Sequence, residues 1–448
     1  MEGNLIKLSK GLDIHLQGKA EEKKIQLKSN GKYALVPDDF EGVTPKVVVK
    51  EGDKVKAGDA LFVNKQYPDV KFASPVSGTV REVVRGERRK VLCIKVDADA
   101  QQEFADFGKR DVGSMSGEQV INALLEAGLF GYINQLPYAV STNPSVQPKA
   151  IFVSALRDKP LAAEFEYEVK GQEQVFQTGL TALSKIAKTY LGVGVNSALK
   201  GMNDVVVNVF DGKCPAGNVG VQVNHVDPVN KGEVVWTIGD PTVVLFIGRL
   251  FNTGKVNLSR TVALCGSEIT SPAYVDMLVG EELSTLLSNS YDASKSVRII
   301  NGNVLTGKPT TKEGFLGAHT SEITVIPEGN DADEMLGWIL PRFKQFSVNR
   351  SDFSWLLGKK QYALDARVKG GERHMIMSGE YDRVLPMDIY GEYLIKAIIS
   401  GDIDRQEQLG IYEVAPEDFA LAEFVDSSKL ELQRIVREGL NILRKENA

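Results

Sequence analysis

The three cysteines, Cys93, Cys214 and Cys265, are the first candidates for redox chemistry in this chain of 448 residues. An iron–sulfur cluster usually needs four thiolates, often with the tight C-x-x-C spacing. Here the cysteines are odd in number and lie far apart in the sequence. We therefore expect neither a cluster nor a disulfide framework, and the low cysteine count fits a reducing compartment.

The four histidines, His15, His225, His319 and His374, are the candidates for metal binding. They are isolated from one another in the sequence. We expect each to be a surface or hydrogen-bonded residue rather than a ligand, so no metal site and no catalytic residue is predicted.

Glycine-rich segments could hold a phosphate group through their backbone N–H groups. Gly192, Gly194 and Gly201, and the sequence P-A-G-N-V-G at residues 215–220, do not match G-x-G-x-x-G at the start of a helix after a strand. These glycines indicate structural turns, and no cofactor-binding residue is predicted from them.

A lysine on a hairpin could carry a covalent group. Residues 47–63 contain V-K-E-G-D-K-V-K-A-G-D, in which two Gly-Asp pairs mark turns between short strands, and S-P-V-S-G-T-V follows at residues 74–80. This order resembles the barrel-sandwich fold of biotinyl and lipoyl carrier domains. Lys65 lies near the position of a carrier lysine, but neither neighbour is methionine. We expect Lys65 to be an unmodified loop residue on a domain kept for structure or docking.

Length and composition set the frame for these residues. A chain of this length is expected to form three or four domains. The net charge of −6 argues against nucleic-acid binding. No apolar run reaches the length of a membrane-spanning helix, and the start of the chain shows no signal-peptide pattern. The longest apolar run, residues 242–248, predicts a buried strand.

The pattern of strands and helices predicts an α/β multidomain protein. Strands are expected at residues 150–155, 204–209 and 243–247, with a helix at 178–191, which favours a parallel, Rossmann-like sheet. Ser116 and Gln119 form a capping box, and Gly128 is placed to end that helix.

The remaining sequence predicts two further units. Strands at 261–264, 297–300 and 322–326, with a short helix at 283–288, form a β-grasp-like pattern of the soluble-ligand-binding type. The C-terminal part is expected to be helical, with Pro416 at a first helical position and a second capping box at Ser428 and Glu431. The expected domains are an N-terminal segment 1–32, the barrel-sandwich domain 33–97, the Rossmann-like domain 115–255, the β-grasp domain 256–330 and the helical domain 331–448.

Eight short motifs together resemble the A subunit of the Na+-translocating NADH:quinone oxidoreductase. They occur in order over some 420 residues, at 6–13, 150–155, 159–163, 176–184, 247–251, 262–266, 383–389 and 416–425. The domain series also resembles the flavin-binding subunit of respiratory complex I and the large soluble subunit of the Rnf complex.

Two departures from those relatives concern redox chemistry. The flavin loop of the complex I relative is rich in glycine, whereas the comparable residues 128–138 keep two glycines among bulky side chains. The relatives place cluster-binding cysteines after the motif that ends at Val425, and none follows here. No S-G-A-T-like site for a covalent flavin is present either. The resemblance thus implies the scaffold of a redox subunit, while these departures argue that its own cofactors are gone, and flavins and iron are expected on other subunits.

The resemblance implies a role in a six-subunit complex that oxidises NADH, reduces ubiquinone or menaquinone and exports Na+. The chain would be peripheral at the cytoplasmic face of the bacterial inner membrane, docked on the membrane subunits, with the B subunit as the expected partner. The alternatives are an Rnf-like or independent NADH-dependent flavoprotein, supported by the strand–helix rhythm, and a carrier-domain protein, supported by residues 33–96.

Any quinone contact is expected beyond the carboxyl ends of the parallel strands, at the position where the relatives hold flavin. Phe130, Tyr132 and Tyr138 are the predicted quinone-binding residues. Aromatic faces suit a flat quinone ring, and a tyrosine hydroxyl can donate to its carbonyl. The alternative is that these side chains fill the former flavin cavity.

Overall fold

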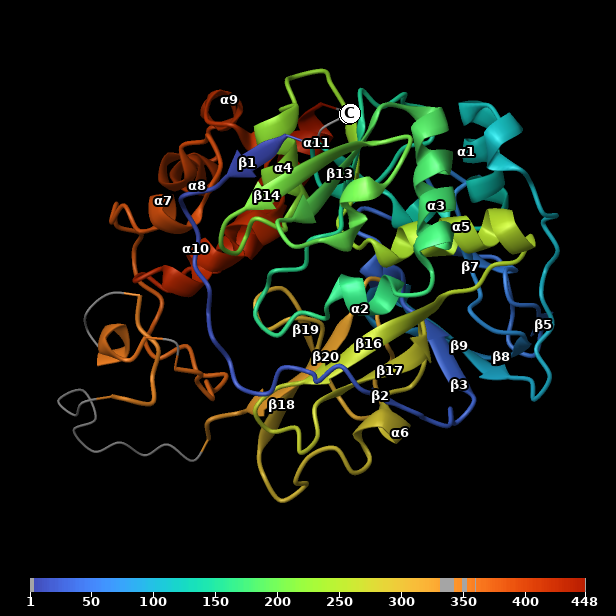
Figure 1. The fold of residues 1–448 in the computed structure, drawn as a ribbon, viewed down its shortest axis with the longest axis horizontal. Helices are drawn as coiled ribbons and strands as arrows, with labels where there is room; N and C mark the ends of the chain where they lie inside the picture. Colours follow the sequence, from blue (N-terminus) through green and yellow to red (C-terminus); the bar gives the residue numbers. More distant parts are fainter. Residues whose placement is uncertain (1–3, 331–341, 349–352, 359, 448) are drawn as a thin grey trace.

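A seven-stranded sheet forms the centre of the computed structural model, which describes all residues except 1–3, 331–341, 349–352, 359 and 448 (Figure 1). The strand order is β1 (Leu5–Lys7), β14 (Val206–Asp211), β13 (Thr189–Gly194), β12 (Ile151–Ser154), β15 (Val235–Ile238), β10 (Asn134–Leu136) and β11 (Val140–Ser141). The first five strands are parallel, and β10 and β11 are antiparallel to their neighbours.

Both faces of this sheet are covered, because successive side chains of a strand point to opposite faces. Ile151 and Val153 of β12 pack with α1 (Gly117–Glu126), α3 (Glu173–Ile186) and α5 (Thr242–Thr253). Phe152 packs on the other side, with α4 (Val219–Val226). The strand is buried along its whole length, which explains its unbroken run of apolar residues.

A six-stranded sheet lies below it in Figure 1. Its order is β19 (Lys308–Thr310), β18 (Val297–Asn301), β20 (Glu322–Pro327), β16 (Ser259–Cys265), β17 (Ala273–Leu278) and β2 (Lys24–Ile25), and α6 (Ser284–Leu287) packs nearby. The N-terminal segment links the two sheets, since β1 joins the first sheet and β2 the second. The short helix α2 (Phe165–Val169) follows β12 in the chain.

The N-terminal β domain consists of two small sheets. One contains β3 (Lys32–Leu35), β9 (Val91–Ala98), β8 (Gly78–Arg85) and β5 (Lys54–Val55), and the other contains β4 (Pro45–Val47), β6 (Ala60–Asn64) and β7 (Lys71–Ala73). Lys65 directly follows β6 and is exposed in the turn that leads to β7.

The C-terminal helices lie on the side of the seven-stranded sheet away from α1, α3 and α5 (Figure 1). They are α7 (Tyr381–Val384), α8 (Gly391–Ser400), α9 (Ile403–Gln408), α10 (Ala420–Val425) and α11 (Leu432–Glu446). Pro416 opens a 3-10 turn, Pro416–Phe419, at its first position, as predicted.

The first capping box is confirmed. The Ser116 hydroxyl accepts from the Gln119 N–H, and the Gln119 side chain accepts from the Ser116 N–H. Gly128 follows the end of α1 with a φ of +69°, the left-handed conformation in which glycine is favoured. The second capping box is wrong: Glu431 itself precedes α11, and the Ser428 hydroxyl donates to the His374 carbonyl instead.

Two further predicted elements differ from the structure, one in its type and one in its bounds. Residues 243–247 form part of helix α5 and not a strand. Residues 242–248 of this helix are all buried, so this run lacks a polar stripe and resembles a buried strand. The helix expected at 178–191 begins earlier, at Glu173, and ends at Ile186, because Tyr190 and Leu191 belong to β13.

Candidate ligand-binding cleft

The strand order of the seven-stranded sheet reverses next to β12. β12, β13 and β14 follow one another outward on one side, whereas β15, the next parallel strand of the chain, pairs with the other side of β12. The segments that follow β12 and β15 therefore begin next to each other, beyond the carboxyl ends of both strands, at the point where the strand order reverses. Open α/β sheets bind their ligands at such a point.

A cleft of about 560 Å³ lies at this point. Residues 156–159, after β12, and Gly239–Asp240, after β15, form part of its lining. The N-terminal domain contributes Asp39, the six-stranded sheet contributes Asn301 and Glu322, and the C-terminal part contributes Glu417 and Arg437. All the major parts of the fold therefore meet at this cleft.

Buried ion pairs fix the side of the cleft near α5. Asp240 lies 2.9 Å from Arg157 Nη2 and 3.0 Å from Arg260 Nη1, and Arg157 Nη1 lies 3.0 Å from Glu168. Arg260 also donates to the Ala318 carbonyl at 3.1 Å. Burial by itself would raise the pKa of Asp240, but the two guanidinium groups hold it well below its ordinary value of 3.8. Asp240 is therefore ionised and held rigidly in place.

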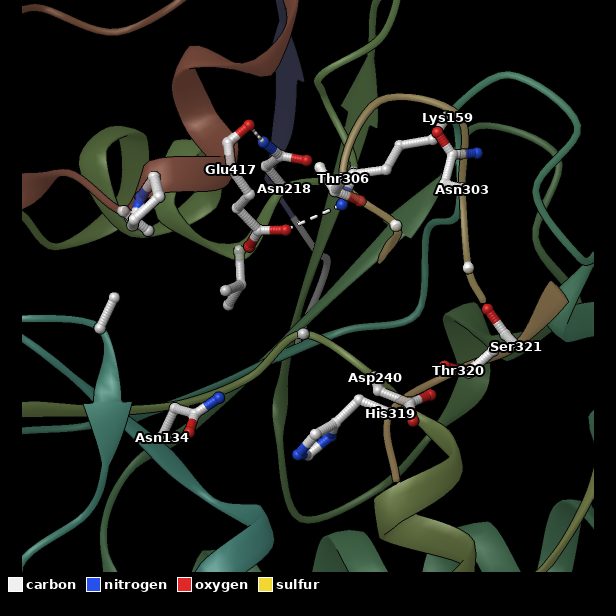
Figure 2. A pocket seen from close by; sticks show the side chains of 18 of the residues that line it. Asn134, Lys159, Asn218, Asp240, Asn303, Thr306, His319, Thr320, Ser321 and Glu417 are labelled. Atoms are coloured by element: carbon white, nitrogen blue, oxygen red, sulfur yellow. Dashed lines mark hydrogen bonds and ion pairs between the residues drawn. The ribbon is translucent and has the colours of Figure 1, made fainter. Parts of the chain in front are cut away.

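His319 lies beside Asp240 (Figure 2). Its ring centroid is 5.4 Å from that of Tyr132 and 5.7 Å from that of Phe40. Burial lowers the pKa of His319 to about 4, although the Asp240 carboxylate acts in the opposite direction. The imidazole is thus neutral at pH 7, and a neutral imidazole can donate one hydrogen bond and accept another.

Tyr132 lines the same region, on the 3-10 turn Phe130–Tyr132 that precedes β10. Its side chain is 2% exposed, yet its hydroxyl has no hydrogen-bond partner among the residues that the structure describes. Burial, reinforced by Asp39, raises the pKa of this hydroxyl well above its ordinary value of 10.0, so the group keeps its proton. A buried hydroxyl without a partner is costly, and a ligand that accepts its proton would remove that cost.

A second polar group lies on the side near the C-terminal helices (Figure 2). Lys159 Nζ is 2.8 Å from Glu417 Oε2, and the Asn218 amide donates at 3.1 Å both to the Glu417 carbonyl and to Asp418. Burial, together with the neighbouring Glu417, raises the pKa of Asp418 to about 7. These contacts join the loop after β12 and the start of α4 to the C-terminal domain.

The structure separates the three predicted quinone-binding residues. Tyr132 lines the cleft, whereas Phe130 is fully buried and packs edge-on against Trp236 at 5.3 Å. Tyr138 is turned elsewhere: its hydroxyl accepts from Asn447 and its carbonyl accepts from Arg437.

Sequence reasoning missed Asp240, His319, Asn218 and Glu417 as cleft residues. Asp240 could have been found from the sequence, because it lies between strand β15 and helix α5. If 242–253 had been recognised as a helix, Asp240 would have been placed at the carboxyl end of a strand, where ligands bind. His319 and Glu417 could not have been found, since only the tertiary fold brings them there.

No group of three or more histidine, cysteine or carboxylate side chains is placed to hold a metal ion within the described part of the chain. The three cysteines are unpaired; Cys214 and Cys265 are buried and Cys93 is half-buried.

Comparisons with known proteins agree over the whole chain. Residues 6–99 match the model of the NqrA N-terminal barrel-sandwich hybrid domain, residues 115–256 the NqrA second alpha/beta domain, and residues 261–312 the NQRA C-terminal domain. The barrel-sandwich prediction for the N-terminal domain is thereby confirmed.

The curated relatives match this chain over nearly its full length. The A subunit of the Na(+)-translocating NADH-quinone reductase of Yersinia pestis bv. Antiqua is 33% identical, over 99% of this chain and 100% of its own length. The protein of the same name from Neisseria meningitidis serogroup B is 32% identical, and that from Haemophilus influenzae strain PittGG is 34% identical, each with the same coverage.

Solved structures are more distant. Two structures of an NAD+-reducing [NiFe]-hydrogenase, in its air-oxidized and H2-reduced states, align at 11% identity with TM-scores of 0.33 and 0.34. They cover 48% and 75% of this chain, and 47% and 64% of their own chains, a likeness too low to indicate a shared fold. The full-length relatives and the three domain models, by contrast, show that this chain belongs to the NqrA family, which forms the A subunit of the Na(+)-translocating NADH-quinone reductase.

Proposed function

We propose that this chain is a peripheral docking subunit that has no redox cofactor of its own and binds the quinone head group in the cleft beside Tyr132. Its relatives are named as subunits of the Na(+)-translocating NADH-quinone reductase. In the proposal this complex oxidises NADH, reduces ubiquinone or menaquinone and exports Na+. The chain would lie at the cytoplasmic face of the bacterial inner membrane and dock on the membrane subunits, chiefly the B subunit. In this proposal the seven-stranded unit is Rossmann-like and the six-stranded unit is a β-grasp domain.

Tyr132 is the observation that supports quinone binding. Its protonated, buried hydroxyl lacks a partner in the described structure, and a quinone carbonyl accepts a hydrogen bond without carrying charge. The His319 ring, which also lines the cleft, lies 5.4 Å from the Tyr132 ring, so a flat ring would meet aromatic surfaces there. The many polar side chains of the cleft suit a carbonyl-bearing head group better than an isoprenoid tail.

The absence of a flavin is supported by the packing of residues 128–138. A side chain at Gly131 would overlap with the ring of Phe72, so this turn is pressed against the N-terminal domain. Phe130, the first residue of this turn, is fully buried and packs against Trp236. A loop held in this way offers few free backbone N–H groups to a flavin phosphate. In the proposal, flavins and iron belong to the other subunits.

Peripheral attachment is supported by the helix lengths. Across the described residues, no helix has both the length and the apolar composition needed to cross a bilayer. The chain would then reach the membrane through its partner subunits.

We expect the isolated protein to show no absorbance above the 280 nm protein band, because the turn that replaces the flavin loop is closely packed and the described residues offer no group of three metal-ligating side chains. The test is an absorbance spectrum with flavin and iron analysis after mild purification from the native host. Stoichiometric flavin or iron would contradict the proposal and favour an independent or Rnf-like flavoprotein instead.

We expect Tyr132→Phe to weaken quinone binding to the intact complex by ~0.5–1.5 kcal/mol, the net contribution of one hydrogen bond. This corresponds to an increase of about 2–12-fold in Kd. Folding should be unharmed, because the hydroxyl has no partner to lose among the described residues. The measurement is a quinone titration of complexes that contain either form of the chain.

Tyr138→Phe is the matched control for this test. It removes the same hydroxyl from a residue whose side chain is directed to Asn447, and it should leave the Kd unchanged. A photoreactive quinone gives the independent readout, with labelling expected at the cleft. If labelling is confined to the membrane subunits, then Tyr132 only fills space and this chain has a structural and docking role.

A further inference from the structure

A second large cavity lies on the C-terminal helices, away from the cleft. It is a groove of about 1170 Å³ between α8, α9, the start of α11 and residues 372–375. We call it the basic groove. Apolar side chains form much of its lining, namely Met375, Ile399, Leu409, Leu430 and Ile435. Its volume lies above the roughly 300–1,000 Å³ of typical small-molecule sites.

The outer face of α8 lacks a partner among the described residues. Leu394, Ile395 and Ile398 face the core, as an amphipathic helix requires. On the outer side Tyr393 is 59% exposed and Ile399 is 56% exposed. Both of these side chains border the groove, so the helix presents apolar surface to it.

Further exposed apolar residues adjoin the groove-lining residues in the chain. Tyr390, directly before α8, is 67% exposed, and its ring centroid lies 6.4 Å from that of Tyr393. Ile376 and Met377, directly after the segment that lines the groove, are also exposed. Exposed apolar side chains gathered beside a groove mark an interaction site more often than a solvated face.

The charge of the groove limits what can occupy it. Three cationic side chains line it, Arg373, Lys396 and Arg405, against the single acidic side chain of Glu372. Arg373 and Lys396 form no ion pair within the described structure, and Arg405 has only a long contact of 3.7 Å with Asp402. This positive surface stands out in a chain whose net charge is −6. Carboxylates on the occupant would complement it.

The shape favours a polypeptide over a lipid surface. A concave groove with an apolar floor and charged rim matches the way in which an amphipathic helix or strand binds along a groove. A bilayer surface is flat on this scale and would leave the floor uncovered.

We propose that the basic groove holds a segment of another subunit of the reductase, with apolar side chains on one face and carboxylates on the other. The inference rests on the docking role proposed above and assigns that role to one surface. Tyr393 and Ile399 would contact the apolar face of the segment, and Arg373 and Lys396 its carboxylates.

The direct test places a photo-crosslinking amino acid at position 393 of the full chain within the intact complex. The expected result is one adduct with another subunit, mapped by mass spectrometry to a peptide that contains both acidic and apolar residues. The control is the same amino acid at Leu92, an exposed position on β9 of the N-terminal domain. Adducts only with lipid, only with a second copy of this chain, or at no higher yield than from Leu92 would each overturn the proposal.

A charge-reversal variant gives a second test. The double change Arg373→Glu and Lys396→Glu should lower the amount of this chain retained in the complex by about tenfold at physiological salt, because two attractive contacts become repulsive. The double change Arg373→Lys and Lys396→Arg should retain it. Both side chains are exposed, so the melting temperature of the isolated chain should be unchanged in either variant.

The outcomes separate this inference from the proposed function. Normal retention of the charge-reversed chain would refute the basic groove as the docking surface and leave the docking role intact. If the wild-type chain itself does not co-purify with the other subunits, then the docking role fails, and the groove assignment fails with it.

Discussion

Arg260→Met should lower the free energy of unfolding by about 3–5 kcal/mol, the usual effect of breaking a buried ion pair from one side. The Arg260 side chain is fully buried and lies 3.0 Å from Asp240. Methionine fills a similar volume but leaves Asp240 with Arg157 alone, and it leaves the Ala318 carbonyl without its donor. A buried, ionised carboxylate that loses one of its two guanidinium partners strongly destabilises the fold.

The measurement is urea unfolding at pH 7, with Arg434→Met as the matched control. Arg434 makes two ion pairs on the exposed surface of α11, with Glu431 and Glu438, and exposed pairs of this kind contribute less than about 1 kcal/mol each. A loss from Arg260→Met no greater than that from Arg434→Met would show that the cleft network does not stabilise the fold.

The same network fixes a dependence on pH. The folded pKa of Asp240 lies below its ordinary value of 3.8, so its pairing contributes stability that is present above that value and is lost as the pH falls through the folded pKa. Arg260→Met weakens this pairing. The stability difference between wild type and variant should therefore be full at pH 7 and should shrink in strongly acidic solution.

Elements with a clear local pattern could be predicted from the sequence. The strands at 150–155, 261–264 and 322–326 and the Ser116 capping box agree with the structure, since each depends on residues that are neighbours in the chain. Helix α5 could not be recognised, because residues 242–248 are all buried and this apolar run has no helical periodicity to distinguish it from a strand. The Ser428 capping box failed because that hydroxyl donates to the carbonyl of His374, a distant residue that no local pattern indicates.

The cleft was predictable only in outline. Its position followed from the parallel strands, and Tyr132 followed from the segment that replaces a flavin loop. Phe130 and Tyr132 are two residues apart on a 3-10 turn with about three residues per turn, so their side chains point in different directions, one into the core and one to the cleft. Asp39, His319 and Glu417 reach the cleft from three other parts of the chain, and no local pattern indicates that convergence.

Gly179→Ala should destabilise the protein by about 2–3 kcal/mol, although alanine favours an isolated helix over glycine by roughly 1 kcal/mol. Helices α3 and α5 cross at two glycines. A Cβ at Gly179 would overlap with the carbonyl oxygen of Val244, and a Cβ at Gly248 would overlap with that of Val175. Both obstacles are backbone atoms inside helices, so neither can move aside as a flexible side chain can. The helices would have to separate, which would shift α5 and with it Asp240.

Gln174→Ala is the control for that prediction, because this exposed side chain of α3 faces away from the crossing, and its loss should change stability by less than about 0.5 kcal/mol. Urea unfolding of the two variants distinguishes the effect of helix propensity from that of the helix–helix contact, because the two shift the unfolding midpoint in opposite directions. If Gly179→Ala raises the midpoint, helix propensity dominates and the two helices are not in close contact. If it lowers the midpoint, and the quinone affinity of the assembled complex falls with it, then the glycine crossing positions the end of α5 on which the cleft depends.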